Sequence, residues 1–210
     1  MRMEQPSTIP FLGEEGARGM VLEGLYVPGS ADELGALIAP PHPQFGGSVL
    51  NPVVTELALR CQTLEMTSLR FNWRGVGASA GAVSGEAADS RADYEASLRF
   101  LEESVPGPLL ACGYSWGAVA AHSASEGHAT VRKLALVAPP PSLLDIARLD
   151  TFPGDIFIAV GENDTLADPR SLESIASGLD RTEFVVLDDC DHFFGMGTPE
   201  LGRAFEAWLR

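Results

Sequence analysis

The sequence feature that most constrains the fold is an apolar run that passes abruptly into an alanine-rich segment of helical character. The run 109–112 carries no charge, and Gly113–Gly117, with the sequence Gly-Tyr-Ser-Trp-Gly, follows it directly. A strand can turn into a helix over so few residues only if side chains are missing where the two elements approach, which glycine allows at positions 113 and 117. The pattern predicts a sharp strand-to-helix turn with Ser115 at its apex, on a strained backbone and with an exposed hydroxyl. An ordinary strand-to-helix turn without chemistry is the alternative interpretation.

Short apolar runs alternate with helical segments along the rest of the chain. Alternation of this kind predicts an α/β fold, in which a doubly wound and mostly parallel sheet is flanked by helices. At 210 residues the chain is expected to form a single domain over 1–210, in which 1–17 is a loose leader or an edge strand. The expected strands are 20–27, 35–39, 66–72, 109–112, 133–138, 156–160 and 183–187, and the expected helices are 52–61, 86–103, 116–126, 169–177 and 199–209.

The charge and hydropathy of the chain exclude several kinds of partner. A formal net charge of −15 should repel the phosphates of nucleic acids and anionic membrane surfaces. No apolar segment approaches the length of a membrane span, and the first residues lack the apolar core of a signal peptide. We therefore expect a cytoplasmic protein without a nucleic-acid or membrane partner. The sequence carries no information on the oligomeric state.

No motif predicts a cofactor or a metal. Cys61 and Cys112 are expected to be buried, whereas Cys190 lies close enough to the suspected chemistry to be a candidate reactive thiol. The glycine-rich loop 73–81 does not match the spacing of a dinucleotide-binding loop, and no phosphate-binding lysine follows it. The clustered carboxylates of 188–191 allow a metal site as an alternative, but solvated acids in an acidic protein are the preferred interpretation.

A serine hydroxyl is a poor nucleophile at neutral pH, so Ser115 needs a base that takes its proton and an acid that orients the base. In folds with this kind of turn, the acid and then the histidine follow the serine along the chain. His192 directly follows the run 183–187 and is the expected base. The histidines on or just after the helix behind the turn, His122 and His128, are expected to be solvated surface residues.

The acid is expected to follow a strand later in the chain than Ser115 and before the one that precedes His192. Asp164 comes just after the run 156–160 and is the preferred candidate. Asp168 is its competitor, but its position before Pro169 favours the N-cap of a helix, with the proline at the first helical position.

A tetrahedral oxyanion requires two donors that are already in place. One is expected to be the backbone N–H of Trp116, directly after the serine. The second should come from the loop after the run 35–39, in which the prolines at 40, 41 and 43 have no N–H. The available donors are therefore His42, which we prefer, and Gln44. A rigid turn without a catalytic donor is the alternative for this loop.

With these motifs in order, the chain resembles the α/β-hydrolase superfamily, and within it a small, lidless group of bacterial serine hydrolases related to the dienelactone hydrolase branch. Pro40 stands where the group has a histidine, and Gly195 replaces a frequent second histidine. The serine at position 115 also differs from the cysteine of true dienelactone hydrolases. These departures bear on substrate preference more than on hydrolytic competence. The matching motifs are Pro40–Gly47, Asn51 with Val53 and Val54, Leu69–Ser79, Gly113–Gly117 and Asp191–Phe194.

The resemblance and the ordered residues imply a serine hydrolase that cleaves carboxylic esters or thioesters through an acyl-enzyme on Ser115, without a cofactor, and that takes a small-molecule acyl substrate. Residues 139–155 are too few for a substantial lid, so the site is expected to be open and shallow. Acyl transfer or a specialised biosynthetic step by the same residues is one alternative. A noncatalytic binding protein on the same fold is another.

Overall fold

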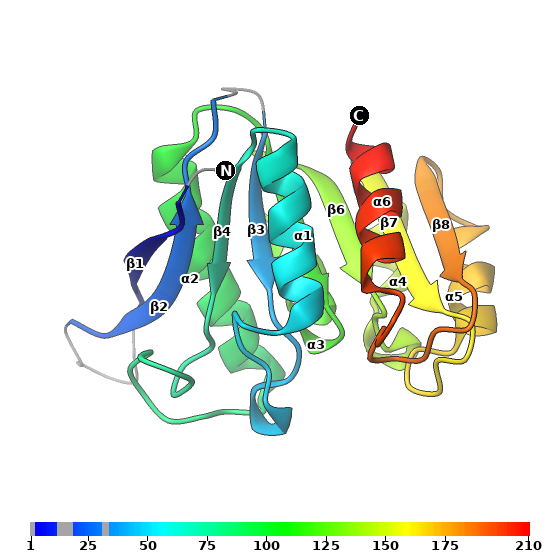
Figure 1. Cartoon of the computed structure of the whole chain (residues 1–210), viewed down its shortest axis with the longest axis horizontal. Coiled ribbons are helices and arrows are strands. Elements are labelled where there is room, and N and C mark those ends of the chain that lie inside the picture. The colour runs from blue at the N-terminus through cyan, green and yellow to red at the C-terminus, as the bar shows by residue number, and fades with distance from the viewer. Residues whose placement is uncertain (1–2, 12–18, 31–33) are drawn as a thin grey trace.

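The apolar runs become the strands of one sheet in a computed structural model, which describes residues 3–11, 19–30 and 34–210. Within these residues the sheet has eight strands in the order β1-β2-β4-β3-β5-β6-β7-β8 (Figure 1). The strands are β1 (Gln5–Pro10), β2 (Val21–Val27), β3 (Gly35–Ala39), β4 (Thr67–Phe71), β5 (Leu109–Tyr114), β6 (Val131–Val137), β7 (Asp155–Gly161) and β8 (Thr182–Leu187). The helices are α1 (Pro52–Thr63), α2 (Ala87–Ser104), α3 (Trp116–Ala124), α4 (Ile146–Asp150), α5 (Pro169–Ala176) and α6 (Thr198–Leu209), with short 3₁₀ turns η1 (Pro43–Phe45) and η2 (Pro141–Leu143).

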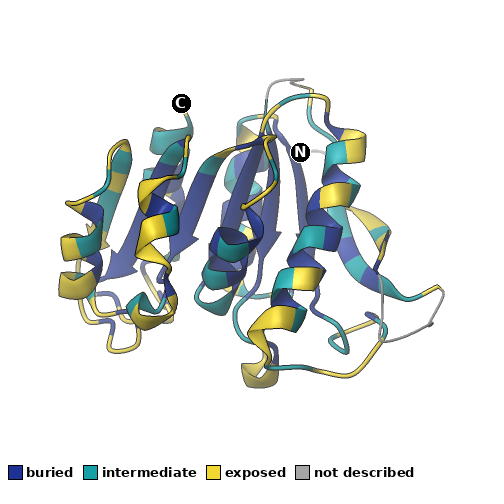
Figure 2. Ribbon diagram, turned by 180° about the vertical axis from the view of Figure 1, so that it is seen from behind, coloured by how far each residue is buried: buried dark blue, intermediate teal, exposed yellow. Residues whose placement is uncertain are grey.

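The sheet is parallel from β4 through β3 and β5 to β8, and antiparallel only where β1 and β2 extend its edge. Helices α1 and α6 lie together on one face, and α2 and α3 lie on the other (Figure 1). Every residue of β3, β4 and β5 is buried (Figure 2), as strands covered on both faces should be, although β4 includes the polar residues Thr67, Ser68 and Arg70. The prediction of a doubly wound, mostly parallel α/β sheet is confirmed.

Two helix starts follow the local signals in the sequence. The Asn51 side chain accepts a hydrogen bond from the Val53 N–H at 2.9 Å, with Pro52 at the first helical position of α1. Asp168 caps α5 in the same way, by accepting from the Ser171 N–H at 2.8 Å. Both assignments made from sequence are confirmed.

The N-terminal segment forms an edge strand, which is one of the two interpretations of 1–17. β1 pairs antiparallel with β2, and residues 12–18 lie outside the described residues. The carboxylate of Glu4, just before β1, receives two hydrogen bonds from the buried guanidinium of Arg70, at 2.6 and 2.8 Å. This ion pair ties the start of the chain to the middle of the sheet.

The connection from β6 to β7 contains only η2 and the five-residue helix α4, so the described structure has no substantial lid. None of the helices formed by the described residues is long and apolar enough to cross a membrane.

His122 is buried, contrary to the expectation of a solvated side chain. It lies on α3, and the connection from β6 to β7 covers it, so that its Nε2 accepts a hydrogen bond from the Asp145 N–H at 3.3 Å. Burial, with a further contribution from Arg148, lowers the pKa of His122 to about 4. His128 is half-buried, with its Nδ1 3.1 Å from the carboxylate of Glu102.

The buried His122 predicts a loss of stability in mild acid. An unfolded histidine titrates near its ordinary pKa of 6.5, whereas the folded His122 titrates near 4, so the unfolded chain binds the proton first. The contribution of neutral, buried His122 to the free energy of unfolding is therefore complete above about pH 7. It is lost as the pH falls from about 6.5 towards 4. The free energy of unfolding can be measured with guanidinium at pH 7 and at pH 5. Its decrease between the two pH values should be about 2 kcal/mol larger in the wild type than in His122→Gln.

The matched control for this titration is His128→Gln, which leaves His122 in place and should keep the acid sensitivity of the wild type. An equal loss of stability in His122→Gln and the wild type would assign the acid sensitivity to other groups.

Candidate active site

The turn between β5 and α3 has the strained geometry that the sequence predicts. Ser115 adopts φ 54° and ψ −116°, a conformation that residues with a side chain rarely occupy. A Cβ at Gly113 would lie 2.1 Å from the Gly117 carbonyl oxygen, and a Cβ at Gly117 would lie 2.5 Å from the carbonyl oxygens of Ala39 and Pro40. Both glycines are therefore required by close backbone approach. The second contact also places the start of α3 directly against the end of β3.

The structure brings Ser115, His192 and Asp164 into one hydrogen-bonded chain. The Ser115 Oγ lies 3.0 Å from His192 Nε2, and His192 Nδ1 lies 2.8 Å from Asp164 Oδ2. Because a carboxylate only accepts, the proton of a neutral imidazole sits on Nδ1, which leaves the Nε2 lone pair facing the serine hydroxyl. Asp164 and His192 are both buried, at 4% and 6% exposure. This is the geometry in which an imidazole can take the hydroxyl proton.

The second oxygen of Asp164 is held by the backbone. Asp164 Oδ1 accepts from the N–H groups of Leu166 and Ala167, at 2.8 and 2.7 Å. These two bonds hold the carboxylate in one orientation, with Oδ2 directed at His192. Asp168, the competing candidate, is exposed and occupied in capping α5.

The loop that carries His192 is positioned by a residue that the sequence reasoning missed. The Tyr114 hydroxyl, one position before the serine, donates to the His192 carbonyl oxygen at 2.7 Å. Burial raises the pKa of Tyr114, so the phenol stays protonated and remains a donor. Gly161 contributes as well, because a Cβ there would lie 2.4 Å from the Cys190 carbonyl oxygen. The variable second position of the Gly-x-Ser-x-Gly motif gave no signal of this role.

Cys190 is buried and is not the reactive thiol that its position suggested. It is 7% exposed, and its sulfur fills the space where Gly197 has no side chain. Burial, and the carboxylates of Glu200 and Asp191 beside it, raise the pKa of the thiol. Cys61 and Cys112 are buried free cysteines, as expected.

Two backbone N–H groups face no protein acceptor near Ser115. Trp116 is the first residue of α3, where a helix leaves its N–H groups unpaired. Within the described part of the chain, no acceptor is found for the N–H of Trp116 or of His42. The Gln44 N–H, by contrast, donates to His42 Nδ1 at 3.2 Å. Of the two sequence candidates in this loop, His42 therefore has the available N–H.

The His42 ring is held against the start of α3. Its centroid lies 4.6 Å from the Trp116 ring and 4.8 Å from the Phe45 ring. Burial lowers the pKa of His42, which keeps the ring neutral and its Nδ1 an acceptor. The Trp116 indole N–H donates to Ser90 Oγ on α2 at 2.7 Å, so this ring is fixed from both sides.

The glycine-rich loop after β4 supports the loop from β3 to α1. The Trp73 indole N–H donates to the Pro41 carbonyl oxygen at 2.9 Å, and Asn72 Oδ1 accepts from the Val49 N–H at 2.8 Å. Arg74 anchors this loop to α2, where it bonds to Asp93 through its backbone and its guanidinium. The loop with the His42 N–H is therefore fixed near both of its ends.

Trp73→Phe tests whether this support matters for chemistry. The change keeps an aromatic ring in the core, removes the N–H that holds Pro41, and also replaces the buried indole by a smaller ring. For the ester hydrolysis that the sequence predicts, we expect kcat to fall about tenfold with little change in KM, because a displaced donor weakens binding of the transition state more than that of the substrate. Steady-state kinetics with a p-nitrophenyl ester would measure both constants.

The matched control is Trp208→Phe on α6, where the indole packs on Phe157 on the sheet and away from Ser115. An equal fall in kcat in both variants would mean that loss of packing, and not the Trp73 hydrogen bond, is responsible.

Comparison with known proteins places this fold in a class. No protein-family profile matches the sequence. The uncharacterized protein RP471 of Rickettsia prowazekii is 27% identical to this chain over an alignment of 213 positions. The alignment covers 96% of this chain and 87% of the relative. An α/β serine hydrolase homologue from Coxiella burnetii superposes with a TM-score of 0.85 at 26% identity, covering 98% of this chain and 97% of that one.

Two further solved structures agree with the first. A protein of unknown function from Agrobacterium tumefaciens, described as a putative α/β hydrolase, has a TM-score of 0.84 at 26% identity. A lidless serine hydrolase from Xanthomonas campestris has a TM-score of 0.84 at 25% identity. Each comparison covers 99% of this chain and 94% of the other. The chain is a member of the α/β-hydrolase superfamily without a lid, and these relatives support an enzyme of the hydrolase class.

Proposed function

We propose that the protein is a serine hydrolase that cleaves carboxylic esters or thioesters. The observation that carries the proposal is the unbroken chain from the Ser115 hydroxyl through His192 to the buried Asp164, with lengths of 3.0 and 2.8 Å. A strained residue at the apex of a strand-to-helix turn, next to unpaired N–H groups, is suited to acyl transfer.

The reaction begins when Ser115 Oγ attacks the acyl carbonyl carbon and its proton passes to His192 Nε2. The tetrahedral oxyanion accepts hydrogen bonds from the N–H groups of Trp116 and His42, and Asp164 stabilises the imidazolium. His192 then donates the proton to the departing alcohol or thiol, which leaves an acyl-enzyme on Ser115. Water, deprotonated by His192, attacks this ester, and the acid is released as the serine recovers its proton. No cofactor takes part.

Fluorophosphonate labelling combined with a substrate panel tests the proposal. The wild type should form a covalent adduct at Ser115, found by peptide mass spectrometry, and should hydrolyse p-nitrophenyl acetate. Matched ester, thioester and amide substrates then define the bond that is cleaved. Amine and alcohol acceptors added to the same assay would reveal acyl transfer. A wild type that is neither labelled nor active would favour a noncatalytic binding protein and would overturn the proposal.

A further inference from the structure

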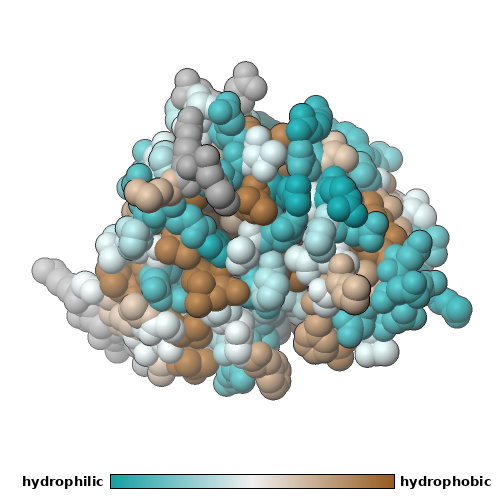
Figure 3. Space-filling model, in the orientation of Figure 1, coloured by the Kyte–Doolittle hydropathy of each residue, from teal (hydrophilic) through white to brown (hydrophobic). Residues whose placement is uncertain are grey.

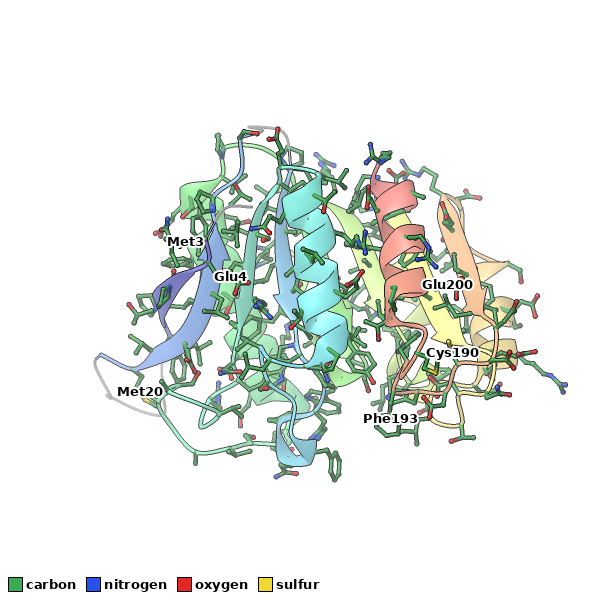
Figure 4. The ribbon with its side chains drawn as sticks, in the orientation of Figure 1. Met3, Glu4, Met20, Cys190, Phe193 and Glu200 are labelled. Atoms are coloured by element: carbon green, nitrogen blue, oxygen red, sulfur yellow. The ribbon has the colours of Figure 1, made fainter. Side chains whose placement is uncertain are left out.

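Large apolar side chains are exposed in the loops that surround Ser115. These loops follow the parallel strands, whose carboxyl ends meet at the lower edge in Figure 1. Phe193 lies at this edge in Figure 4, and Figure 3 shows apolar side chains protruding along it. Single exposed apolar residues are common on proteins, but several around one nucleophile indicate a contact surface. The five that lie in the loops of His42, Asp164 and His192 are Phe45, Leu50, Leu166, Phe193 and Met196.

Two of these residues, in different loops, each contact a histidine of the candidate site. Phe45 is 86% exposed and packs its ring against His42, which in turn contacts the Trp116 ring beside Ser115. Phe193 is 71% exposed and meets the His192 ring edge-on at 5.6 Å between centroids. Phe45 is thus connected to the residue after Ser115 through the His42 ring, and Phe193 contacts the proposed base directly. Two solvent-exposed phenylalanines are therefore available to contact an apolar group bound at Ser115.

The charge around the site is distributed unevenly. The loop 40–51 has no charged residue, whereas 162–168 and 188–197 hold several carboxylates and neither lysine nor arginine. An anionic group approaching the base would be repelled by the negative charges of these two loops. Added salt should weaken this repulsion. The carboxylates of the two loops are Glu162, Asp164, Asp168, Asp188, Asp189 and Asp191.

We propose that the substrate is an uncharged ester or thioester whose apolar group lies between Phe45 and Phe193, and that the acidic loops exclude acyl groups carried on a phosphate-bearing thiol such as coenzyme A. The inference rests on the proposed hydrolase function and specifies its substrate class. The two phenylalanines would favour substrates with an apolar group, and the carboxylates near His192 would repel substrates that carry phosphates.

A matched pair of thioesters tests the charge. Pentanoyl-coenzyme A and S-pentanoyl-N-acetylcysteamine present the same acyl thioester with and without phosphates. We expect kcat/KM for the uncharged compound to be at least about tenfold higher at low ionic strength, and the ratio to shrink in 0.5 M NaCl. The double variant Asp188→Asn, Asp189→Asn should raise kcat/KM for the coenzyme A compound several-fold and leave the uncharged one near the wild-type value.

A pair of esters tests the apolar contact. The ratio of kcat/KM for p-nitrophenyl pentanoate to that for the acetate should fall about tenfold in Phe45→Ala and in Phe193→Ala. Val186→Ala on β8, which also removes an exposed apolar side chain, should keep the wild-type ratio.

Failure of the substrate assignment differs from failure of the hydrolase function. If the wild type labels at Ser115 and is active, but prefers the coenzyme A thioester or keeps its ester ratio in both phenylalanine variants, the substrate assignment is overturned and the hydrolase remains. If the wild type neither labels nor turns over any of these compounds, both are overturned.

Discussion

Ser115→Ala is expected to lower kcat for ester hydrolysis by about 10⁶-fold, the largest effect of any single substitution in this chain. The hydroxyl is the nucleophile and alanine has no replacement for it, while His192 and the unpaired N–H groups stay in place. The residual rate above the uncatalysed reaction should come from substrate binding and from the N–H donors alone. The fold should survive, since the hydroxyl has no described partner other than His192.

The measurement is kcat with p-nitrophenyl acetate, together with fluorophosphonate labelling and circular dichroism. Ser123→Ala, a change of the same kind on the same helix, should keep both labelling and activity, because the Ser123 hydroxyl only donates back to the Ala120 carbonyl oxygen. Parent-level hydrolysis by Ser115→Ala would exclude the acyl-enzyme mechanism.

Much of the fold could be predicted from the sequence because its signals are local. The interiors of β3, β5 and β7 are continuous apolar runs, so the sequence itself identified them as strands, and their ends lie within a few residues of those expected. Asn51 before Pro52, and Asp168 before Pro169, each encode a helix start within a few residues. η2 and α4 were missed, since only contact with the rest of the molecule fixes so short a connection.

The order of Ser115, Asp164 and His192 could be predicted because each follows a separate parallel strand, and the carboxyl ends of these strands meet at one edge. What surrounds the three residues could not be predicted in the same way. Tyr114 is the variable residue of its motif, and its partner lies 78 positions away. His122 looked solvated from its sequence neighbours, but its burial depends on a segment that packs over it after the chain has crossed the sheet.

Asp164→Asn is expected to lower kcat by about 10⁴-fold while leaving the fold intact. The reason lies in the backbone donors. Because the N–H groups of Leu166 and Ala167 both point at Oδ1, the amide oxygen of the asparagine must take that position. Its NH₂ group then faces His192 Nδ1, which can only accept from it. The imidazole is forced into the tautomer with its proton on Nε2, directed at Ser115, and it can no longer act as a base.

Asp164 and its neighbour Asp168 should respond differently to the same substitution. Asp168→Asn keeps a good N-cap for α5 and should change kcat less than twofold. Thermal unfolding of both variants should stay close to the wild type, since asparagine can accept the same backbone N–H bonds, so a difference in kcat would report chemistry and not folding. Loss of activity in Asp168→Asn with activity kept in Asp164→Asn would mean that Asp168, and not Asp164, is the acid of the site. The isosteric change is therefore the more decisive one: it leaves every bond to the backbone in place and alters only which nitrogen of His192 carries the proton.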